Sequence, residues 1–203
     1  MSKFCENHSA CFDAIPLNRP IKHDIILKKH ITTTQDIRSA FMEPRISKEN
    51  YYLNIAETVL ERATCLRRVF GAIIVKNDEI ISTGYNGAPR GRRNCVDMGF
   101  CTREAMRVPR GERYELCRSV HAEANAIISA ARRDMVGGTL YLVGRNAQTG
   151  ELLHDATSCA MCRRMVINAG LSKVVIRHTE RDFSVVDVQD WVDLEDDIPA
   201  QKV

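Results

Sequence analysis

The hydrophobic and polar positions divide the chain into a weakly patterned beginning and a regularly patterned remainder. Residues 1–44 contain prolines at 16, 20 and 44 and, apart from the run Ile25-Ile26-Leu27, no sustained helical or alternating period. Ser47 can cap a helix in which apolar side chains recur at helical spacing, at Tyr52, Ile55, Ala56, Val59 and Ala63. We therefore expect a weakly ordered extension over 1–44 and a folded core that begins near residue 45.

Patterns of strands and helices follow this first helix. The segments 69–76 and 79–85 are β-branched or alternating and are separated by Asn77-Asp78, which predicts a tight antiparallel hairpin. Further along, the pattern predicts a helix over 120–134 capped by Ser119, a strand over 139–143 after Gly137-Gly138, a helix over 159–169 ended by Gly170, and a strand over 173–177. This order predicts an α/β fold, a three-layer α/β/α sandwich with a mixed central sheet.

Composition agrees with one globular domain and an appendage, because 203 residues with 44% hydrophobic and 27% charged content are ordinary for such a chain. The domain is expected over 45–180, and residues 181–203 are expected to add a helix near 187–194 and an acidic tail.

The net charge of +3 is too weak to indicate a nucleic acid or membrane partner. No segment approaches the roughly 18 apolar residues of a membrane span, and residues 1–10 lack a secretory signal core, so we expect a cytoplasmic protein.

The most informative residues open two of the predicted helices. Cys159 and Cys162 lie three positions apart at a helix start, where the helix dipole and free amides favour thiolates. His121 opens the other helix and would complete three protein ligands, which suits zinc and leaves a fourth tetrahedral position for water. Glu123 can take up and return protons beside that water. Together these residues predict a catalytic zinc site rather than a structural zinc knuckle.

With His121-Ala122-Glu123 followed by Cys159-Ala160-Met161-Cys162, the sequence resembles the zinc-dependent nucleoside and nucleotide deaminases, whose signature is His-x-Glu followed by Pro-Cys-x-x-Cys. Ser158 stands where the signature has proline, so the ligands are intact and the turn before them is less rigid. Between about 47 and 177, four further motifs are similar to the deoxycytidylate deaminases: Gly84-Tyr85-Asn86-Gly87, Ala88-Pro89-Arg90-Gly91, Asn94-Cys95-Val96-Asp97 and the helix start 121–127.

This resemblance implies a zinc-dependent hydrolase that converts dCMP to dUMP, releases ammonia and supplies dUMP for thymidylate synthesis. It places Zn²⁺ on His121, Cys159 and Cys162, and it makes Glu123 the residue that moves each proton. It also implies a homo-oligomer, a hexamer or smaller.

The resemblance further implies how the substrate and effectors are held. The backbone of Ala122 would contact the pyrimidine carbonyl, and a backbone carbonyl of Thr157 or Ser158 would accept from the exocyclic amine. Asn86 would hold a sugar hydroxyl, although a turn residue before a glycine is the alternative. The resemblance also implies an allosteric nucleotide site, at which dCTP with Mg²⁺ would activate the enzyme and dTTP would inhibit it. The residues that would contribute to this site are Gly84, Tyr85, Asn86 and Gly87. The sequence contains no triphosphate motif that would establish this regulation independently.

The remaining cysteines cluster around an unusually long connection, residues 86–116, and such loops are functional or stapled. The resemblance implies a second, structural zinc on Cys65 and Cys95, and the positions of Cys101 and Cys117 suggest them as its other two ligands. Free cysteines are the alternative for all four. Near the amino terminus, Cys5, His8 and Cys11 lack a fourth ligand, so we expect free thiols there.

The same loop and its flanks are rich in arginine, whose guanidinium group matches phosphate oxygens. One of these side chains could bind the nucleotide phosphate, and most are expected to be solvated. The candidates are Arg90, Arg92, Arg93, Arg103, Arg107, Arg110, Arg113 and Arg118.

Two other functions stay open at this point. A zinc deaminase could act on a free nucleoside, a riboflavin-pathway pyrimidine or tRNA adenosine, of which the weak net charge disfavours the last. A noncatalytic binding module, such as a DNA-uptake accessory, could use the fold as a scaffold. Such a module has no chemical need of Glu123, which argues for the enzyme.

Overall fold

The computed structural model describes residues 45–109 and 111–194, and the extension expected over 1–44 lies outside them. The amino-terminal elements are α2 (Lys48–Leu60), β1 (Arg68–Lys76), β2 (Glu79–Tyr85), α3 (Cys95–Met98), α4 (Thr102–Ala105) and the 3-10 helix η1 (Tyr114–Leu116). They are followed by α5 (Ala122–Ile128), α6 (Arg132–Met135), β3 (Thr139–Asn146), α7 (Ala160–Ala169), β4 (Lys173–Arg177), β5 (Phe183–Asp187) and α8 (Val188–Asp193). Among the described helices, none has the length and apolar character to cross a membrane.

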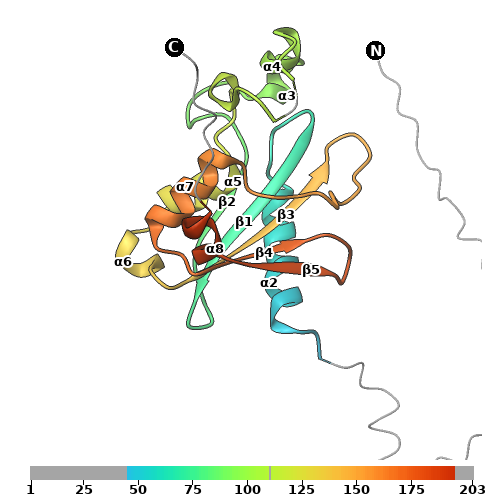
Figure 1. Ribbon diagram of the computed structural model, residues 1–203. Helices are drawn as coiled ribbons and strands as arrows, with labels where there is room; N and C mark the ends of the chain where they lie inside the picture. Colours follow the sequence, from blue (N-terminus) through green and yellow to red (C-terminus); the bar gives the residue numbers. More distant parts are fainter. Residues whose placement is uncertain (1–44, 110, 195–203) are drawn as a thin grey trace, which may run out of the picture. The chain divides into compact units, whose positions relative to one another are not determined.

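The strands of the described region form one mixed sheet in the order β2-β1-β3-β4-β5. β3 and β4 run parallel, and the other neighbouring strands are antiparallel. Helix α2 packs on one face of this sheet, and α5, α6, α7 and α8 pack on the other (Figure 1). The predicted three-layer α/β/α sandwich is therefore confirmed.

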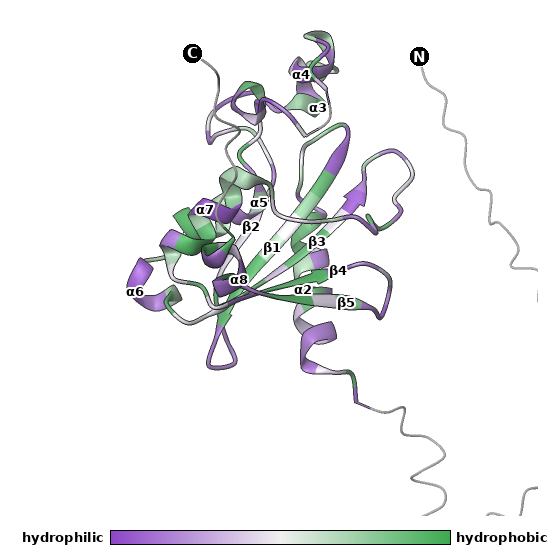
Figure 2. Cartoon of the chain, in the orientation of Figure 1, coloured by the Kyte–Doolittle hydropathy of each residue, from purple (hydrophilic) through white to green (hydrophobic). Residues whose placement is uncertain are grey.

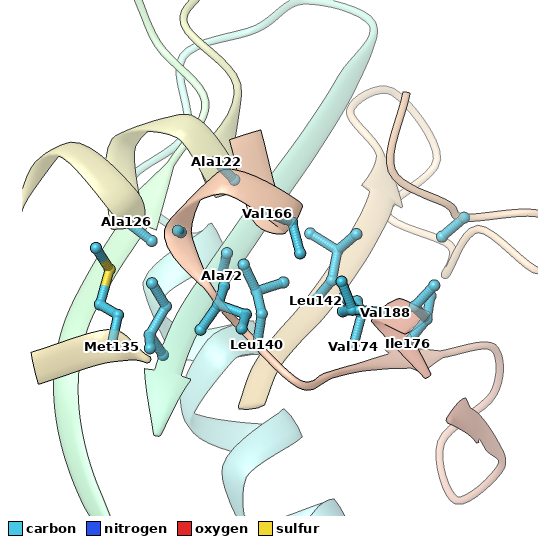
Figure 3. Packing of buried hydrophobic residues seen from close by; sticks show 14 residues of the cluster. Ala72, Ala122, Ala126, Met135, Leu140, Leu142, Val166, Val174, Ile176 and Val188 are labelled. Atoms are coloured by element: carbon cyan, nitrogen blue, oxygen red, sulfur yellow. The ribbon is translucent and has the colours of Figure 1, made fainter. Parts of the chain in front are cut away.

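The core on the side of α5 and α7 is built from small and branched side chains (Figure 3). Alternate residues of a strand point to the same face, and the strands contribute Ala72, Ile74, Leu140, Leu142, Val174 and Ile176. The helices contribute Ala122, Ala126, Met135, Val166, Ala169 and Val188. Because the alanines of α5 are short, that helix lies close to the sheet, and this packing positions the starts of α5 and α7.

The opposite core lies under α2, whose buried residues have helical spacing but are only in part the predicted ones. Ile55 and Val59 are partly buried, and Ala63 follows the end of the helix. Its buried residues Tyr52, Leu53, Ala56 and Leu60 pack against β1, β3 and β4. The predicted cap is also confirmed, because the Ser47 hydroxyl accepts a hydrogen bond from the Asn50 amide at 3.2 Å. Full burial of a side chain such as Leu53 stabilises the fold by about 1.5–3 kcal/mol.

The predicted hairpin between β1 and β2 is confirmed with its turn at Asn77 and Asp78. Both residues have positive φ, 52° and 64°, as a two-residue turn between right-twisted strands requires. The turn is hydrophilic and the strands that it joins are hydrophobic along much of their length (Figure 2). Asp78 also pairs with Lys48 at the start of α2, at 2.6 Å.

The helix predicted over 120–134 is wrong in its extent, because two shorter helices, α5 and α6, occupy this region. Ser119 is not the cap. Val120 exchanges backbone hydrogen bonds with Gly87 at 2.8 and 3.2 Å, so it is extended and the helix starts only after His121. At the other end, the Ser129 hydroxyl donates to the Asn125 carbonyl at 2.7 Å, which competes with the helical hydrogen bond there.

Two strands also differ from the sequence prediction. β3 continues to Asn146, three residues beyond the predicted end, because its last residues pair with the beginning of β1. β5 was not predicted, and it pairs with β4 at the edge of the sheet. The helix predicted near 187–194 is confirmed as α8, and the Asp187 side chain caps it by accepting from the Gln189 amide at 3.0 Å.

An ion network under α2 gives a prediction for stability. Glu57 of α2 accepts hydrogen bonds from Arg177, which is 2% exposed, and from Arg145. Glu57→Gln would leave the buried Arg177 cation without its counter-charge, so we expect the free energy of unfolding to fall by about 3 kcal/mol, as measured by urea denaturation.

The matched control for this prediction is Glu61→Gln. Its carboxylate is 65% exposed and also pairs with Arg145, at 3.2 Å, so we expect a loss below about 1 kcal/mol. Equal losses in the free energy of unfolding for the two variants would contradict the conclusion that the burial of Arg177 makes its ion pair with Glu57 important.

Candidate metal centre and active site

Three side chains that could bind a metal meet at the starts of α5 and α7. His121 and Cys159 occupy the N-cap positions of these helices, and Cys162 lies in the first turn of α7. His121 Nδ1 is 3.4 Å from Cys159 Sγ and 3.4 Å from Cys162 Sγ, and the three ligand atoms all lie within 4.8 Å of one another. One imidazole nitrogen and two sulfurs form the donor set of a three-ligand zinc site, so the residues present fit this metal.

Close packing of α5 on β2 fixes the histidine side of the centre. Gly84 lies under α5, where an added Cβ would be 2.3 Å from the Ala122 carbonyl oxygen and 2.3 Å from the Ala126 nitrogen. The Asn125 side chain donates to the Tyr85 carbonyl at 2.7 Å and ties the same helix to the end of β2. Gly84 is thus a point of helix–strand contact, and its face toward α5 has no room for a nucleotide.

Arg163 of α7 restrains the turn on the cysteine side. Its Nε donates to the Ser158 carbonyl at 3.0 Å and its Nη2 to the Thr157 hydroxyl at 3.4 Å. The Trp191 ring of α8 lies 5.2 Å from the guanidinium carbon. Ser158, which replaces the signature proline, is 1% exposed, so the turn before Cys159 is held by these contacts. Nothing in the sequence pattern marks Arg163 or Trp191 for this role.

Hydrogen bonding gives the two cysteines opposite protonation preferences. A hydrogen bond from Cys162 lowers the pKa of Cys159 to about 4, whereas the same contact, together with burial, raises the pKa of Cys162. Burial favours the neutral form of His121, but hydrogen bonds with Cys117 and Cys159 outweigh it and raise the pKa of His121 to about 10. These values correspond to one thiolate, one thiol and one imidazolium, so metal binding must release protons.

Glu123 lies in the first turn of α5, two residues after His121, and is 4% exposed. Burial raises the pKa of its carboxyl group, while its own backbone amide, His121 and the Ser158 hydroxyl oppose the shift. A carboxyl group with a raised pKa beside a metal centre is suited to general acid–base chemistry.

Asn86 is buried at the end of β2, and both ends of its amide contact the backbone of β1. Its Oδ1 accepts from the Phe70 amide at 2.7 Å, and its Nδ2 donates to the Arg68 carbonyl at 2.9 Å. These contacts leave one N–H and one lone pair of the side chain for a ligand. Asn86 therefore ties the end of β2 to the beginning of β1.

The four cysteines predicted to bind a second zinc lie in one region, because Cys65, Cys101 and Cys117 are each close enough to Cys95 to raise the pKa of its thiol. Their sulfurs do not form a compact set of metal ligands in this structure. Among the described residues, the only metal-compatible group of three or more ligands is the one at His121, and no such group forms among Cys65, Cys95, Cys101 and Cys117. All four are free thiols. Cys117 hydrogen-bonds to His121, which lowers the pKa of its thiol despite burial, whereas burial raises the pKa of Cys95. Cys65 and Cys101 line a pocket of about 590 Å³.

The remaining predictions concern the loop arginines and the amino-terminal thiols. Arg103 is buried, Arg113 pairs with Glu115 at 3.1 Å, and Arg118 Nε donates to the Arg93 carbonyl at 2.7 Å. Arg110 and the group Cys5, His8 and Cys11 lie outside the described residues.

Comparisons with known proteins agree with this centre. A family model for the cytidine and deoxycytidylate deaminase zinc-binding region matches residues 46–178. The deoxycytidylate deaminase of Schizosaccharomyces pombe (strain 972 / ATCC 24843) is 33% identical over 131 residues, which cover 64% of this chain and 37% of that protein. The deoxycytidylate deaminase of Mycobacterium phage D29 is 33% identical over 132 residues, which cover 63% of this chain and 91% of that protein.

A solved structure is also similar. The crystal structure of dCMP deaminase from the cyanophage S-TIM5 in apo form has 26% sequence identity and a TM-score of 0.45, and the match covers 67% of this chain and 85% of that one.

Proposed function

The chain belongs to the cytidine and deoxycytidylate deaminase family, and we propose that it is a zinc-dependent hydrolase that converts dCMP to dUMP and releases ammonia. The observation that carries the chemistry is the buried Glu123 carboxyl beside the His121, Cys159 and Cys162 donor set. The choice of dCMP is supported by the relatives at 33% identity, which are deoxycytidylate deaminases.

His121 through Nδ1 and the two cysteines through their sulfurs would hold the zinc ion. Bound zinc supplies a Lewis acid that makes water a nucleophile near neutral pH. Glu123 takes a proton from the attacking water and delivers it to ring N3. It then takes the second proton from the hydroxyl group added at C4 and delivers it to the amine, so that the C4 carbonyl forms as ammonia leaves. Its burial excludes bulk water from these transfers, and its raised pKa lets it hold a proton between them.

The neighbouring backbone and Asn86 would hold the substrate. We assign the Ala122 backbone to the pyrimidine carbonyl and the unshared Asn86 amide groups to the sugar hydroxyl. The Ser158 carbonyl already accepts from Arg163, so the Thr157 carbonyl is our choice as acceptor for the exocyclic amine. Self-association, a second zinc on the four loop cysteines, and dCTP and dTTP control with Mg²⁺ are further proposals that rest on the family resemblance alone.

Purified zinc-loaded protein is expected to release ammonia from dCMP at least about tenfold more efficiently, by kcat/KM, than from deoxycytidine. The reason is that a site for a nucleotide gains binding energy from phosphate contacts that a nucleoside lacks. Ammonia release can be followed by a coupled assay and dUMP formation by chromatography.

The panel should also contain a tRNA anticodon stem. Faster turnover of deoxycytidine or of the tRNA would move the assignment to another zinc deaminase. Inertness of zinc-loaded protein toward every substrate would favour the noncatalytic module.

A further inference from the structure

A stack of three side chains connects the loop between β2 and α5 to the metal centre. The guanidinium carbon of Arg103 lies 4.6 Å from the centre of the Tyr114 ring. The Tyr114 and His121 rings meet edge to face, with their centroids 5.1 Å apart and their planes at 88°. The loop therefore reaches a metal ligand through an aromatic ring that the sequence pattern did not single out.

Arg103 is the buried anchor of this stack. Only 6% of its surface is exposed, although a loop arginine is ordinarily solvated. Its Nη2 donates to the backbone carbonyls of Pro109, at 2.8 Å, and Glu112. These bonds partner the buried cation within its own loop and hold the guanidinium over the Tyr114 ring, so Arg103 is occupied by the loop rather than free for a phosphate.

The stack acts on the orientation of the imidazole. A metal-binding histidine needs its ring held so that one nitrogen points at the ion, and contacts to the rest of the ring provide this hold. Here Nδ1 faces the sulfurs of Cys159 and Cys162, while the Tyr114 ring meets the imidazole edge to face. Cys117 adds a hydrogen bond to the same imidazole.

We propose that Tyr114 and Arg103 are positioning residues for the metal centre: the tyrosine ring sets the orientation of His121, and the arginine holds the tyrosine. This inference rests on the zinc site of the proposed function. It also gives the long loop a role, since the placement of Arg103 and Tyr114 becomes a condition for tight metal binding.

The test measures zinc affinity by competition with a chromogenic chelator, without substrate. Tyr114→Leu is expected to weaken zinc binding about 10- to 100-fold, the usual effect of removing a group that orients a metal ligand. Tyr114→Phe keeps the ring and should stay within about twofold of the unmodified protein. Cobalt-loaded Tyr114→Leu should show altered visible absorption bands, because they report the ligand geometry.

Matched controls separate positioning from general stability. Tyr51→Leu makes the same change on the exposed side of α2 and should leave zinc affinity unchanged. Arg103→Met removes the cation from above the ring without touching His121 and should weaken zinc binding several-fold. Thermal unfolding of the zinc-loaded variants shows that each is folded.

Unchanged zinc affinity in Tyr114→Leu would overturn the proposal, and so would equal losses in the Leu and Phe variants, which would assign the effect to the hydroxyl group. Unchanged affinity in Arg103→Met would overturn the role of the arginine. Because these measurements need no turnover, their failure is distinguishable from a failure of the dCMP assay.

Discussion

Glu123→Gln is expected to lower kcat for dCMP by at least about 10³-fold while zinc stays bound. Positioned acid–base groups contribute about 10²–10⁴-fold to rate, and Glu123 belongs at the upper end because we assign it each of the proton transfers. Glutamine fills nearly the same volume in this buried position and can still hydrogen-bond, but it cannot accept and return a proton. Steady-state kinetics with metal analysis of the same sample measure both parts of the prediction.

Glu79→Gln is the control for this variant, since Glu79 is exposed on β2, away from the centre. It should leave kcat unchanged. Retention of a tenth of the normal kcat in Glu123→Gln would show that another group moves the protons. Loss of zinc from the same variant would mean that the carboxylate holds the metal rather than the protons.

Cys162→Ser is expected to abolish stoichiometric zinc binding at the centre, and activity with it. Cys162 is a fully buried ligand, and a hydroxyl group is a poor donor for zinc compared with a thiolate. The bound metal should fall by one ion per chain when measured after dialysis against a weak chelator. If the four loop cysteines hold a second zinc as proposed, the intact protein contains two ions, and Cys162→Ser and Cys95→Ser each retain one.

Zinc binding to the intact centre should release about two protons at pH 6. The pKa of His121 is raised to about 10 and that of the Cys162 thiol is raised, so both hold a proton at this pH, whereas Cys159 with a pKa of about 4 is already a thiolate. Zinc must displace the two protons, and binding should therefore strengthen about 100-fold per pH unit as the pH rises. Calorimetry in buffers of different ionisation enthalpy counts the protons. Release of none would contradict the protonation states described here.

Local sequence signals predicted most of the fold. The hairpin, the first helix and the Gly170 stop are set by neighbouring residues: two turn residues with positive φ, a capping serine and a left-handed glycine. The helix expected over 120–134 was wrong because the extended pairing of Val120 with Gly87 is a contact between segments distant in sequence. β5 lies at the edge of the sheet and none of its five residues is buried, whereas β4, of the same length, has a continuous buried run. Its pairing with β4 therefore defines β5.

In the metal centre too, local sequence signals predicted some residues, and contacts between distant segments determined the others. His121, Cys159 and Cys162 could be predicted because they lie at or within one turn of a helix start, and their types and spacing carry the chemistry. The side chains that hold them could not, since Arg163 and Tyr114 act through tertiary contacts with no periodic signature. Arg103 shows the difference: it was one of eight loop arginines that could bind a phosphate and were mostly expected to be solvated, whereas the structure buries its side chain within the loop.

The split of the donor set between two helices makes the ion a removable cross-link. His121 and Cys159 are 38 residues apart along the chain, so a metal bound by both would close a loop of the chain that contains α5, α6 and β3. Such a tie restricts the unfolded chain and stabilises the folded one in proportion to the logarithm of free zinc, by about 4 kcal/mol at a thousand times the dissociation constant. The supply of zinc would then determine how long the protein survives as well as whether it works.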